Sequence, residues 1–444
     1  MNYYSTNDKA PIATLEKAVI KGLAEDKGLY MPERIKPLPK EFFEHIEKMS
    51  FQEIAYKVAE CFFGEDVDCE SLKNIVYDTL KFDCPVEKVA ENIYTLELFH
   101  GPTLAFKDVG ARFMARLLQY FLKKGGEYIR SNGAERKNNE VNVLVATSGD
   151  TGSAVANGFL GVEGIHVYVL YPKGKVSPIQ ECQFTTLGKN ITAIEIDGVF
   201  DDCQALVKSA FMDEELNKNM MLTSANSINV ARFLPQAFYY FNAYARMKER
   251  GLAEKLVMCV PSGNFGNICS ALFGKRMGLP VKRFIAANNA NDIFFNYLQT
   301  GEYHPKASVQ TIANAMDVGD PSNFARIYNL YKGNHKAICN DISGATYKDQ
   351  EIRNIMQECY SNTGYVLDPH GACGYQALKD GLKEGEMGVF CETAHPAKFK
   401  STVDEILSSD IEIHARVQEF MKGEKKSVEM GKDFESFKAF LLSE

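Results

Sequence analysis

The feature that most constrains the fold is a recurring order of short apolar run, small-residue loop and amphipathic segment. Four apolar runs are followed by such a loop and then an amphipathic segment. They lie at residues 94–99, 141–146, 256–260 and 387–391. Short apolar runs of this kind are typical of strands, and strands that alternate with helices are typical of a parallel sheet covered by helices. The sequence therefore predicts an α/β fold. Ligands bind at the carboxyl ends of such strands, so we expect the four loops to share one cleft.

The chain is long enough to form more than one hydrophobic core. Its 444 residues exceed the size at which a single core usually stops growing. The first hundred residues look mainly helical, with apolar residues at helical spacing after a possible N-cap at Thr14 and breaks at Gly28 and Pro32. We expect a helical N-terminal region over 1–93, a small α/β domain over 94–230 and a large α/β domain over 231–444.

Charge and composition exclude several classes of function. The net charge is −8 and no basic run is present, which argues against a nucleic-acid partner. Eleven cysteines occur without a C-x-x-C pair, so the sequence predicts reduced thiols and no metal site. No apolar run has membrane-spanning length and the N-terminus lacks the apolar core of a secretory signal, so we expect no membrane partner and a cytoplasmic location.

Lys107 is the side chain best placed for covalent chemistry with a carbonyl compound. It follows the apolar residues 104–106 at the expected start of a helix. A free lysine amine, with a pKa of roughly 10.4, is too protonated to attack a carbonyl. Partial burial and the positive end of a helix dipole both disfavour the charged form, which prepares the amine for imine formation. An exposed lysine in a first helical turn is the alternative, and the motif alone leaves both open.

The loop at 262–267, with the sequence SGNFGN, has the features of an anion-binding turn. It follows an apolar run and opens a helix, and Gly263 and Gly266 remove side chains where a ligand would approach the backbone. Free amides at a helix N-terminus suit a phosphate. The loop has neither a Walker A ending nor a G-x-G-x-x-G pattern, so nucleotide binding gains little support. A tight turn without a ligand is the alternative.

A second loop, TSGDTGS at 147–153, adds hydroxyls and a carboxylate to the same strand, loop and helix setting. Hydroxyls and backbone amides together suit a substrate carboxylate or a second phosphate. Helix capping alone is the alternative.

The segment NSINVAR at 226–232 and the residue Thr393 complete the candidates. Two amides, a hydroxyl and the guanidinium of Arg232 form a donor-rich set for a dianionic phosphate, although an arginine in this position is often a solvated surface residue. The hydroxyl of Thr393, just after the fourth apolar run, can hydrogen-bond a pyridine nitrogen without fully protonating it. His395 and Lys398 nearby are candidates for acid–base chemistry, but we interpret each of them as structural or solvent-facing.

Taken together, these motifs resemble, in order, the motif series of the threonine synthases. The segments concerned are HGPTLAFKDVGARF, ATSGDTGSAVANGF, NSINVAR, VPSGNFGN, NAMDVGDPSN and TAHPAKFK, across residues 94–402. The N-terminal region, with GLYMP at 28–32, is similar to the longer bacterial and fungal branch of that family.

The resemblance implies a fold type II pyridoxal 5′-phosphate enzyme with two open, mainly parallel α/β domains. In such an enzyme Lys107 would be the catalytic residue and would carry the cofactor covalently. The other cofactor-binding residues implied are Gly263, Asn264, Phe265, Gly266, Asn267 and Thr393. The implied substrate-binding residues are Thr147, Ser148, Asp150 and Thr151 for the α-carboxylate and Asn226, Ser227 and Arg232 for the phosphate.

The implied reaction converts O-phospho-L-homoserine and water to L-threonine and phosphate, in a monomer or a homodimer. A phospholyase that releases an oxoacid would use the same motifs, and a catalytically silent homologue that binds a phosphorylated metabolite is a third hypothesis. Relatives in the wider fold group commonly carry asparagine where this chain has Asp150, which leaves the partner of the cofactor's 3′-oxygen open.

Overall fold

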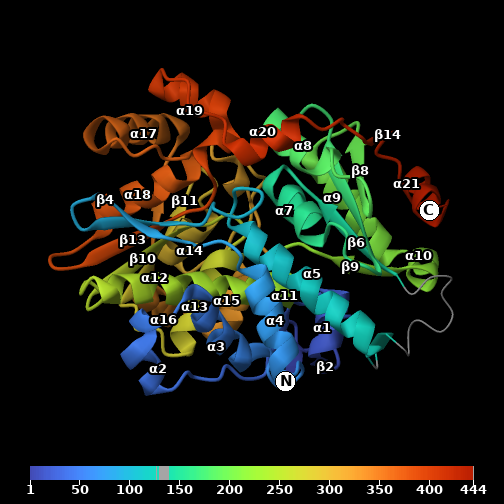
Figure 1. Ribbon diagram of the computed structural model, residues 1–444, viewed down its shortest axis with the longest axis horizontal. Helices are drawn as coiled ribbons and strands as arrows, with labels where there is room; N and C mark the ends of the chain where they lie inside the picture. Colours follow the sequence, from blue (N-terminus) through green and yellow to red (C-terminus); the bar gives the residue numbers. More distant parts are fainter. Residues whose placement is uncertain (127, 130–139, 444) are drawn as a thin grey trace. The chain divides into compact units, whose positions relative to one another are not determined.

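The computed structural model describes residues 1–126, 128–129 and 140–443 (Figure 1). The chain forms two compact units that are each assembled from distant stretches of sequence. Unit one consists of Met1, Met31–Phe106 and Phe233–Glu412, and unit two consists of Asn2–Tyr30, Lys107–Arg232 and Ile413–Glu444. The three consecutive domains expected from the sequence stay a prediction. They differ from these units because stretches near both ends of the chain join the central stretch in unit two.

Unit one is built on a six-stranded sheet with the order β12-β11-β10-β13-β5-β4. Its strands are β4 (Val86–Ala90), β5 (Ile93–Glu97), β10 (Leu256–Pro261), β11 (Arg283–Asn288), β12 (Ile342–Thr346) and β13 (Met387–Glu392). All neighbouring pairs are parallel except β4 and β5, which pair antiparallel. β10 and β13 lie side by side, with Cys259 opposite Phe390.

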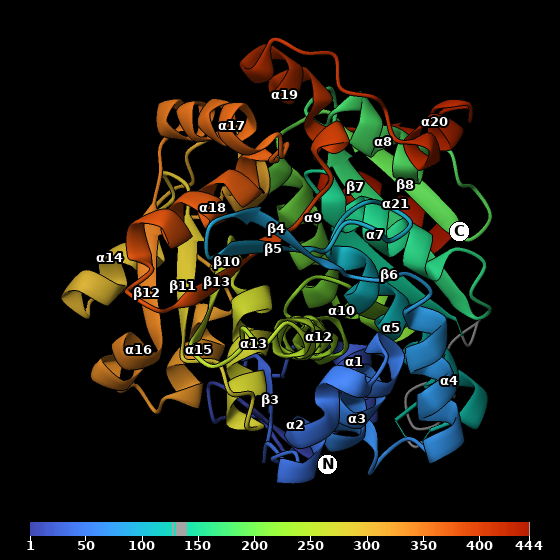
Figure 2. The ribbon, with the colours of Figure 1, turned by 60° about the vertical axis from the view of Figure 1, so that its left-hand side comes forward.

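The helices of unit one lie on its sheet and on one another. They are α2 (Lys40–His45), η1 (Ile46–Lys48), α3 (Phe51–Phe63), α4 (Cys69–Thr79), η2 (Leu234–Gln236), α12 (Ala237–Glu249), α13 (Gly266–Arg276), α14 (Ile293–Thr300), η3 (Asn314–Met316), α15 (Phe324–Leu330), α16 (His335–Asp341), α17 (Asp349–Thr363), α18 (Pro369–Gly381), η4 (Pro396–Phe399) and α19 (Lys400–Leu407). α18 lies against β10, β11 and β13 (Figure 2).

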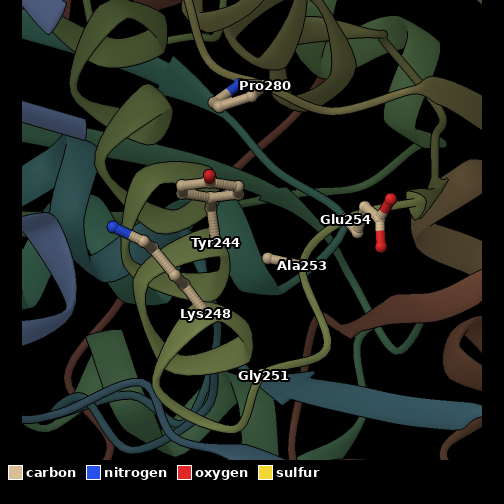
Figure 3. Close-up of a pocket in the computed structure, with 6 residues that line it drawn as sticks. All are labelled: Tyr244, Lys248, Gly251, Ala253, Glu254 and Pro280. Carbon is tan, nitrogen blue, oxygen red and sulfur yellow. The ribbon is translucent and has the colours of Figure 1, made fainter. Parts of the chain in front are cut away.

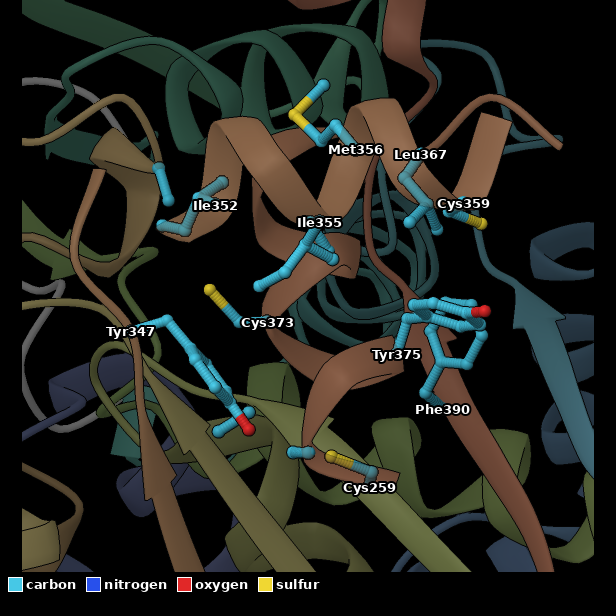
Figure 4. Close-up of a cluster of buried hydrophobic side chains, with 14 of the residues drawn as sticks. Cys259, Tyr347, Ile352, Ile355, Met356, Cys359, Leu367, Cys373, Tyr375 and Phe390 are labelled. Carbon is cyan, nitrogen blue, oxygen red and sulfur yellow. The ribbon is translucent and has the colours of Figure 1, made fainter. Parts of the chain in front are cut away.

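A buried apolar cluster fixes α17 and α18 to the sheet. Figure 4 shows Ile355 of α17 pointing toward Cys373 of α18, with Tyr375 of α18 next to Phe390 of β13. Burial of apolar side chains contributes about 25 cal/mol per Å² removed from water. This cluster therefore holds the end of β13, where Thr393 follows, in a fixed place relative to α18.

Unit two is built on a five-stranded sheet with the order β14-β8-β7-β6-β9. Its strands are β6 (Val141–Ala146), β7 (Ile165–Pro172), β8 (Ile191–Ile196), β9 (Met221–Ser224) and β14 (Val428–Met430), and every neighbouring pair is parallel. Two short strands near the N-terminus, β1 (Asn2–Ser5) and β2 (Ala13–Thr14), pair antiparallel. β3 (Tyr30–Pro32) lies where the chain passes from unit two to unit one.

The helices of unit two cover this sheet. They are α1 (Leu15–Lys21), α5 (Lys107–Lys124), α7 (Asp150–Phe159), α8 (Pro178–Thr185), α9 (Phe200–Met212), α10 (Glu214–Asn219), α11 (Val230–Phe233), α20 (Ala415–Met421) and α21 (Phe434–Ser443). Thr14 caps α1 by accepting a hydrogen bond from Lys17 N at 3.3 Å, as the sequence predicts. α5 packs on α7 so closely that a Cβ on Gly158 would lie 2.9 Å from the carbonyl carbon of Ala111.

The predicted α/β class is confirmed, and each of the four predicted strands is present. Three of them, β5, β10 and β13, are neighbours in the sheet of unit one, and the fourth, β6, belongs to unit two. The single cleft expected for their loops stays a prediction. The first hundred residues, expected to be mainly helical, also contain the strands β1, β2, β3 and β4, which the sequence did not predict.

Candidate functional site

The segment that leads to Lys107 is fixed to the end of β13. Phe106 N donates to Thr393 O at 2.9 Å, and His395 N donates to Leu104 O at 3.0 Å. Leu104 has a left-handed backbone, with φ of 60°, which a bulky residue adopts only when its surroundings demand it. Lys107 is the next residue after Phe106, so its backbone follows directly on a rigid loop held at Thr393.

Side chains reinforce the same loop. The hydroxyl of Tyr239 donates to the carbonyl oxygen of Phe106, and the amine of Lys398, which is 1% exposed, donates to Thr103 O at 2.8 Å. His395 caps the helix η4, because its Nδ1 accepts from Ala397 N at 3.1 Å. Both His395 and Lys398 therefore have structural contacts, and Lys398 is buried and not solvent-facing. Lys107 begins α5, as the sequence predicts.

The loop at 262–267 connects β10 to α13 and presents backbone amides. Phe265, the residue before the helix, has a left-handed backbone with φ of 62°, and α13 begins at Gly266. Within the described residues, the amides of Gly263, Phe265, Gly266 and Asn267 donate no hydrogen bond. Unpaired amides at a helix N-terminus form a cradle for an anion.

The side chains of this loop stabilise its shape. Asn267 donates from Nδ2 to Pro261 O at 2.8 Å and accepts from Ser262 Oγ at 3.1 Å, so its amide side chain is engaged within the loop. A Cβ on Gly263 would lie 2.7 Å from Ala315 O and 2.9 Å from the Cα of Met316. Gly263 thus permits close approach by the chain's own backbone, whereas the sequence interpretation attributed this glycine to the approach of a ligand.

A second segment holds the loop from outside. Asn264 Oδ1 accepts from Ser322 N at 2.6 Å, and Asn264 O accepts from Asn323 Nδ2 at 3.0 Å. Both partners belong to the motif at 314–323 that the sequence singles out, which gives this motif a supporting role for the loop.

These residues fit the two ends of a pyridoxal phosphate. The amide cradle is of a kind that suits a phosphate, and Thr393, which is 8% exposed, has a hydroxyl of the kind that can hydrogen-bond a pyridine nitrogen. β10 and β13 are parallel neighbours, so the loop at 262–267 and Thr393 leave the sheet of unit one at the same edge. Among the described residues, no group of three or more His, Cys, Asp and Glu side chains is arranged to hold a metal ion.

In unit two, the loop at 147–153 is organised by its first residue. Thr147 Oγ1 accepts from Gly149 N at 2.9 Å and from Gly152 N at 2.8 Å, and Thr147 is 1% exposed. Its hydroxyl therefore stabilises the loop from within. The amides of Ser148 and Thr151 donate no hydrogen bond in the part of the chain that the structure describes, which leaves them for a carboxylate.

Asp150 is held by a residue that the sequence did not suggest. Gln180 Nε2 donates to Asp150 Oδ1 at 3.0 Å, and Asp150 is 6% exposed. A Cβ on Gly149 would lie 2.5 Å from the Gln180 side chain, and Gly149 has φ of 144°, so only glycine suits this position. No local signal identifies Gln180, because it lies on α8, thirty residues farther along the chain.

The segment at 226–232 follows β9 and contains a buried arginine. Arg232 is 2% exposed and donates from Nη1 to the carbonyl oxygen of Ala225. The alternative of a solvated surface residue is therefore wrong. Asn229 anchors the segment, since its Nδ2 donates to Val19 O at 2.8 Å and to Ser224 O at 3.2 Å.

Unit two brings its candidate residues close to one another. β6 and β9 are parallel neighbours, with Leu144 opposite Ser224, so the loop at 147–153 and the segment at 226–232 leave the sheet at the same edge. The first turn of α5, which begins with Lys107, lies against the second of these segments, because a Cβ on Gly110 would be only 2.4 Å from Arg232 O.

A hollow elsewhere in unit one contains none of the predicted site residues. It has a volume of about 300 Å³ and is lined by Tyr244, Lys248, Gly251, Ala253, Glu254 and Pro280 at the end of α12 (Figure 3). The amine of Lys248 is engaged with Phe43 O at 2.7 Å and with Glu47 at 2.8 Å.

No helix among the described residues is long and apolar enough to cross a membrane.

Comparisons with known proteins give three family matches and several close relatives. Residues 79–391 match the family described as pyridoxal-phosphate dependent enzyme, residues 2–80 match the threonine synthase N terminus, and residues 371–441 match the threonine synthase C-terminal family. A threonine synthase from Haemophilus influenzae is 43% identical over 443 residues, with 100% of each chain covered.

Solved structures give the same result. The crystal structure of threonine synthase from Escherichia coli has a TM-score of 0.90 and 40% identity, with 100% of each chain covered. The structure of a PLP-bound threonine synthase from Brucella melitensis has a TM-score of 0.90 and 32% identity, and the match covers 99% of this chain and 98% of that one.

Proposed function

The chain belongs to the threonine synthase family of pyridoxal-phosphate-dependent enzymes, and from that premise we propose that it converts O-phospho-L-homoserine and water to L-threonine and phosphate, the last step of threonine biosynthesis. One observation carries most weight for the substrate. The buried guanidinium of Arg232 belongs to a segment that lies against the first turn of the helix that Lys107 begins. A buried cation beside a reactive amine suits a substrate that carries both a phosphate and an amino acid group.

The proposed cofactor-binding residues are those identified from the sequence. Lys107 carries pyridoxal 5′-phosphate covalently, and the hydroxyl of Thr393 hydrogen-bonds the ring nitrogen. The backbone amides of the loop at 262–267 bind the phosphate, with Gly263, Asn264, Phe265, Gly266 and Asn267 as the residues involved. The left-handed conformation of Phe265 supports this assignment, because it turns successive amides in one direction.

The proposed substrate-binding residues divide by the group that they hold. The loop with Thr147, Ser148, Asp150 and Thr151 binds the α-carboxylate. In that loop Ser148 and Thr151 offer amides, whereas Thr147 acts through the loop shape that its hydroxyl maintains. Asn226, Ser227 and Arg232 bind the substrate phosphate.

When bound, the cofactor withdraws electron density from the substrate carbons through its conjugated ring. Lys107 moves the protons: its amine removes one from Cα and then one from Cβ of the substrate. Arg232 stabilises the negative charge of the phosphate as this group leaves Cγ. Lys107 then returns a proton to Cγ, which becomes the methyl group. Water adds at Cβ, and Lys107 returns a second proton to Cα, which completes threonine.

Product analysis with purified enzyme tests the proposal. O-Phospho-L-homoserine should yield threonine and inorganic phosphate in equal amounts, as measured by chromatography and a phosphate assay. A phospholyase would release an oxoacid and ammonia in place of threonine, and either of these as the main product would contradict the proposal.

We further propose that the enzyme works in the cytoplasm as a monomer or a homodimer. The eleven cysteines, all free thiols, support a reducing compartment. Burial raises the pKa of Cys203, Cys269 and Cys391 to about 12, which keeps these thiols unreactive. Light scattering during size-exclusion chromatography measures the assembly.

A further inference from the structure

Three buried polar residues near Thr393 form a network that the proposed chemistry does not use. Asp368 and Glu392 are 0% exposed, and His370 is 2% exposed. Asp368 N donates to Glu392 Oε1 at 2.6 Å, and His370 Nδ1 lies 2.6 Å from Asp368 Oδ2. Buried polar groups are costly unless they are paired, so this arrangement has a specific geometry to maintain.

The hydrogen bonds define the tautomer of His370. Ala315 N donates to His370 Nε2 at 3.1 Å, so this ring nitrogen accepts and carries no proton. The proton of the neutral ring is therefore on Nδ1 and is donated to Asp368. Nδ1 of the imidazole thus donates to Asp368, and Nε2 accepts from the backbone amide of Ala315.

Local structure explains why Asp368 and Glu392 occupy these positions. Asp368 caps α18, because its Oδ1 accepts from Gly371 N at 2.6 Å. A Cβ on Gly371 would lie 1.6 Å from Glu392 Oε2, so only glycine lets the helix approach this carboxyl. Burial and then the neighbouring charge of Asp368 raise the pKa of Glu392 well above its usual range, which favours the protonated form of Glu392.

The network ends at both groups that we propose for the cofactor. At one end, Glu392 is the residue immediately before Thr393 on β13. At the other end, the backbone of Ala315 is the surface against which Gly263 of the loop at 262–267 packs, with 2.7 Å between Ala315 O and a Cβ built on Gly263. A continuous series therefore joins Thr393 to the loop through Glu392, Asp368, His370 and Ala315.

We propose that His370 is a positioning residue for the cofactor, which holds the backbone of Ala315 under the phosphate-binding loop at a fixed distance from Thr393. This inference rests on the proposed assignment of that loop and of Thr393 to pyridoxal phosphate. His370 touches neither the cofactor nor the substrate in this role. Its contribution is that the loop is already shaped when the phosphate binds, which reduces the ordering that binding requires.

Two substitutions of His370 separate the tasks of its two nitrogens. His370→Gln can place an oxygen near the position of Nε2 and accept from Ala315 N, whereas His370→Asn can place a donor near the position of Nδ1 but cannot reach Ala315. The cofactor dissociation constant is measured by dialysing each holoenzyme against a series of pyridoxal phosphate concentrations and recording visible absorbance. We expect a rise of at least about tenfold for His370→Asn, because the partly buried amide of Ala315 loses its acceptor and no longer holds the backbone under the loop. His370→Gln should stay within about threefold of the unsubstituted enzyme.

Asn242→Ala is the matched control for general destabilisation. Asn242 is 1% exposed in the same unit and donates from Nδ2 to Cys84 O at 2.9 Å, so its side chain bonds neither the loop nor Thr393. An equal loss of cofactor affinity in this control, or equal dissociation constants for the two His370 variants, would overturn the inference. If His370→Asn does not fold, a tenfold weaker cofactor affinity in His370→Gln alone would overturn it, and an unchanged affinity would support it.

The result is independent of the reaction product. Failure of the unsubstituted enzyme to form threonine from O-phospho-L-homoserine would contradict the proposed function, whatever the dissociation constants of the His370 variants. Normal threonine formation together with unchanged cofactor affinity in His370→Asn would contradict only the positioning role.

Discussion

The two units offer different kinds of chemical group at the edges of similar sheets. Unit one presents main-chain amides, in the loop at 262–267, and one hydroxyl, that of Thr393. Unit two presents the main-chain amides of Ser148 and Thr151 together with side chains, among them the buried guanidinium of Arg232. Backbone amides need no ordering when a ligand binds, whereas side chains can adjust to a ligand that enters and leaves. The difference fits the proposal that unit one binds the phosphate and ring nitrogen of the cofactor, whereas unit two contributes Lys107 and the groups for the substrate.

The contacts that hold these groups in place also differ between the two units. The loop of unit one is held by backbone contacts at Ala315 and by hydrogen bonds from Ser322 and Asn323 to Asn264. The groups of unit two are held mainly by side-chain amides, with Gln180 on Asp150 and Asn229 on the carbonyl of Val19. Substitutions in the two units should therefore affect different measurable quantities.

The largest effect is expected at Lys107, which belongs to the chemistry itself. Lys107→Ala should lower turnover of O-phospho-L-homoserine by roughly 10²–10⁴-fold or more, because general acid–base catalysis of this size is lost together with covalent attachment. Steady-state kinetics measures the loss. Borohydride reduction of the unsubstituted enzyme, followed by peptide mass spectrometry, should find the cofactor on Lys107. Attachment to Lys398 or another lysine would disprove the assignment.

Gly263→Val should affect the cofactor before it affects substrate recognition. The new Cβ would meet Ala315 O at 2.7 Å, so either the loop or the backbone beneath it has to move. Overpacking of this kind typically costs about 1–3 kcal/mol. We expect the cofactor dissociation constant to rise by about tenfold or more, measured by dialysis and visible absorbance.

Gly431→Val is the matched control for Gly263→Val. Gly431 has no heavy atom within 4 Å of a built Cβ, so the same added volume meets no obstacle there. Equal cofactor occupancy in the two variants would remove the argument for the loop at 262–267.

Arg232→Ala should affect turnover of the substrate and leave cofactor binding unchanged, the reverse of Gly263→Val. Charge-assisted hydrogen bonds contribute about 1.5–3 kcal/mol, so kcat/KM for O-phospho-L-homoserine should fall by at least roughly tenfold while the visible spectrum of the cofactor stays unchanged. Arg232→Lys should recover part of the loss, because an ammonium supplies charge without the planar fork of a guanidinium.

The control for this substitution is Arg416→Ala, at an exposed position of the same unit. It should leave kcat/KM unchanged. If Arg232→Ala loses the cofactor, or turns over the substrate normally, the contrast between the two units does not hold.

The smallest effect concerns stability at the edge of unit one. Burial, and then the charge of Asp368, raise the pKa of Glu392 well above its usual range. The protonated form is the one that the fold favours, so its contribution to stability is complete below the unfolded pKa of about 4.3 and is lost as pH rises through the raised pKa. Glu392→Gln keeps a neutral group of the same shape at every pH.

Thermal unfolding between pH 5 and 9 measures this effect. The melting temperature of Glu392→Gln relative to that of the unsubstituted enzyme should increase as pH rises. A constant difference across this range would show that Glu392 does not titrate in it.

Local sequence patterns were sufficient where a residue's role depends on its immediate neighbours. The cap at Thr14, the four strands and the helices that follow them are as predicted, because apolar spacing and capping residues act within a few positions. The loop at 262–267 and Lys107 were also identified at the correct boundaries between elements. The backbone that Gly263 packs against was not identified, because Ala315 lies more than fifty residues farther along the chain.

Residues whose role depends on distant partners gave no local signal. Gln180 beside Asp150, and His370 between Asp368 and Ala315, act through contacts that only the folded chain creates. The burial of Arg232 has the same origin. From the sequence, an arginine after a strand is expected at the surface. Arg232 is buried only because α5 and the elements around β9 pack against it.

The sequence by itself determined the α/β class, the order of the motifs and the chemical character of each loop, because hydrophobic periodicity and turn residues act over short distances. Only the tertiary structure decided which stretches form one unit. The C-terminal strand β14, for example, completes the sheet of unit two beside β8, more than two hundred residues earlier in the chain. Its few residues could not specify that partner, because strand pairing depends on an edge that exists only after the rest of the sheet has formed.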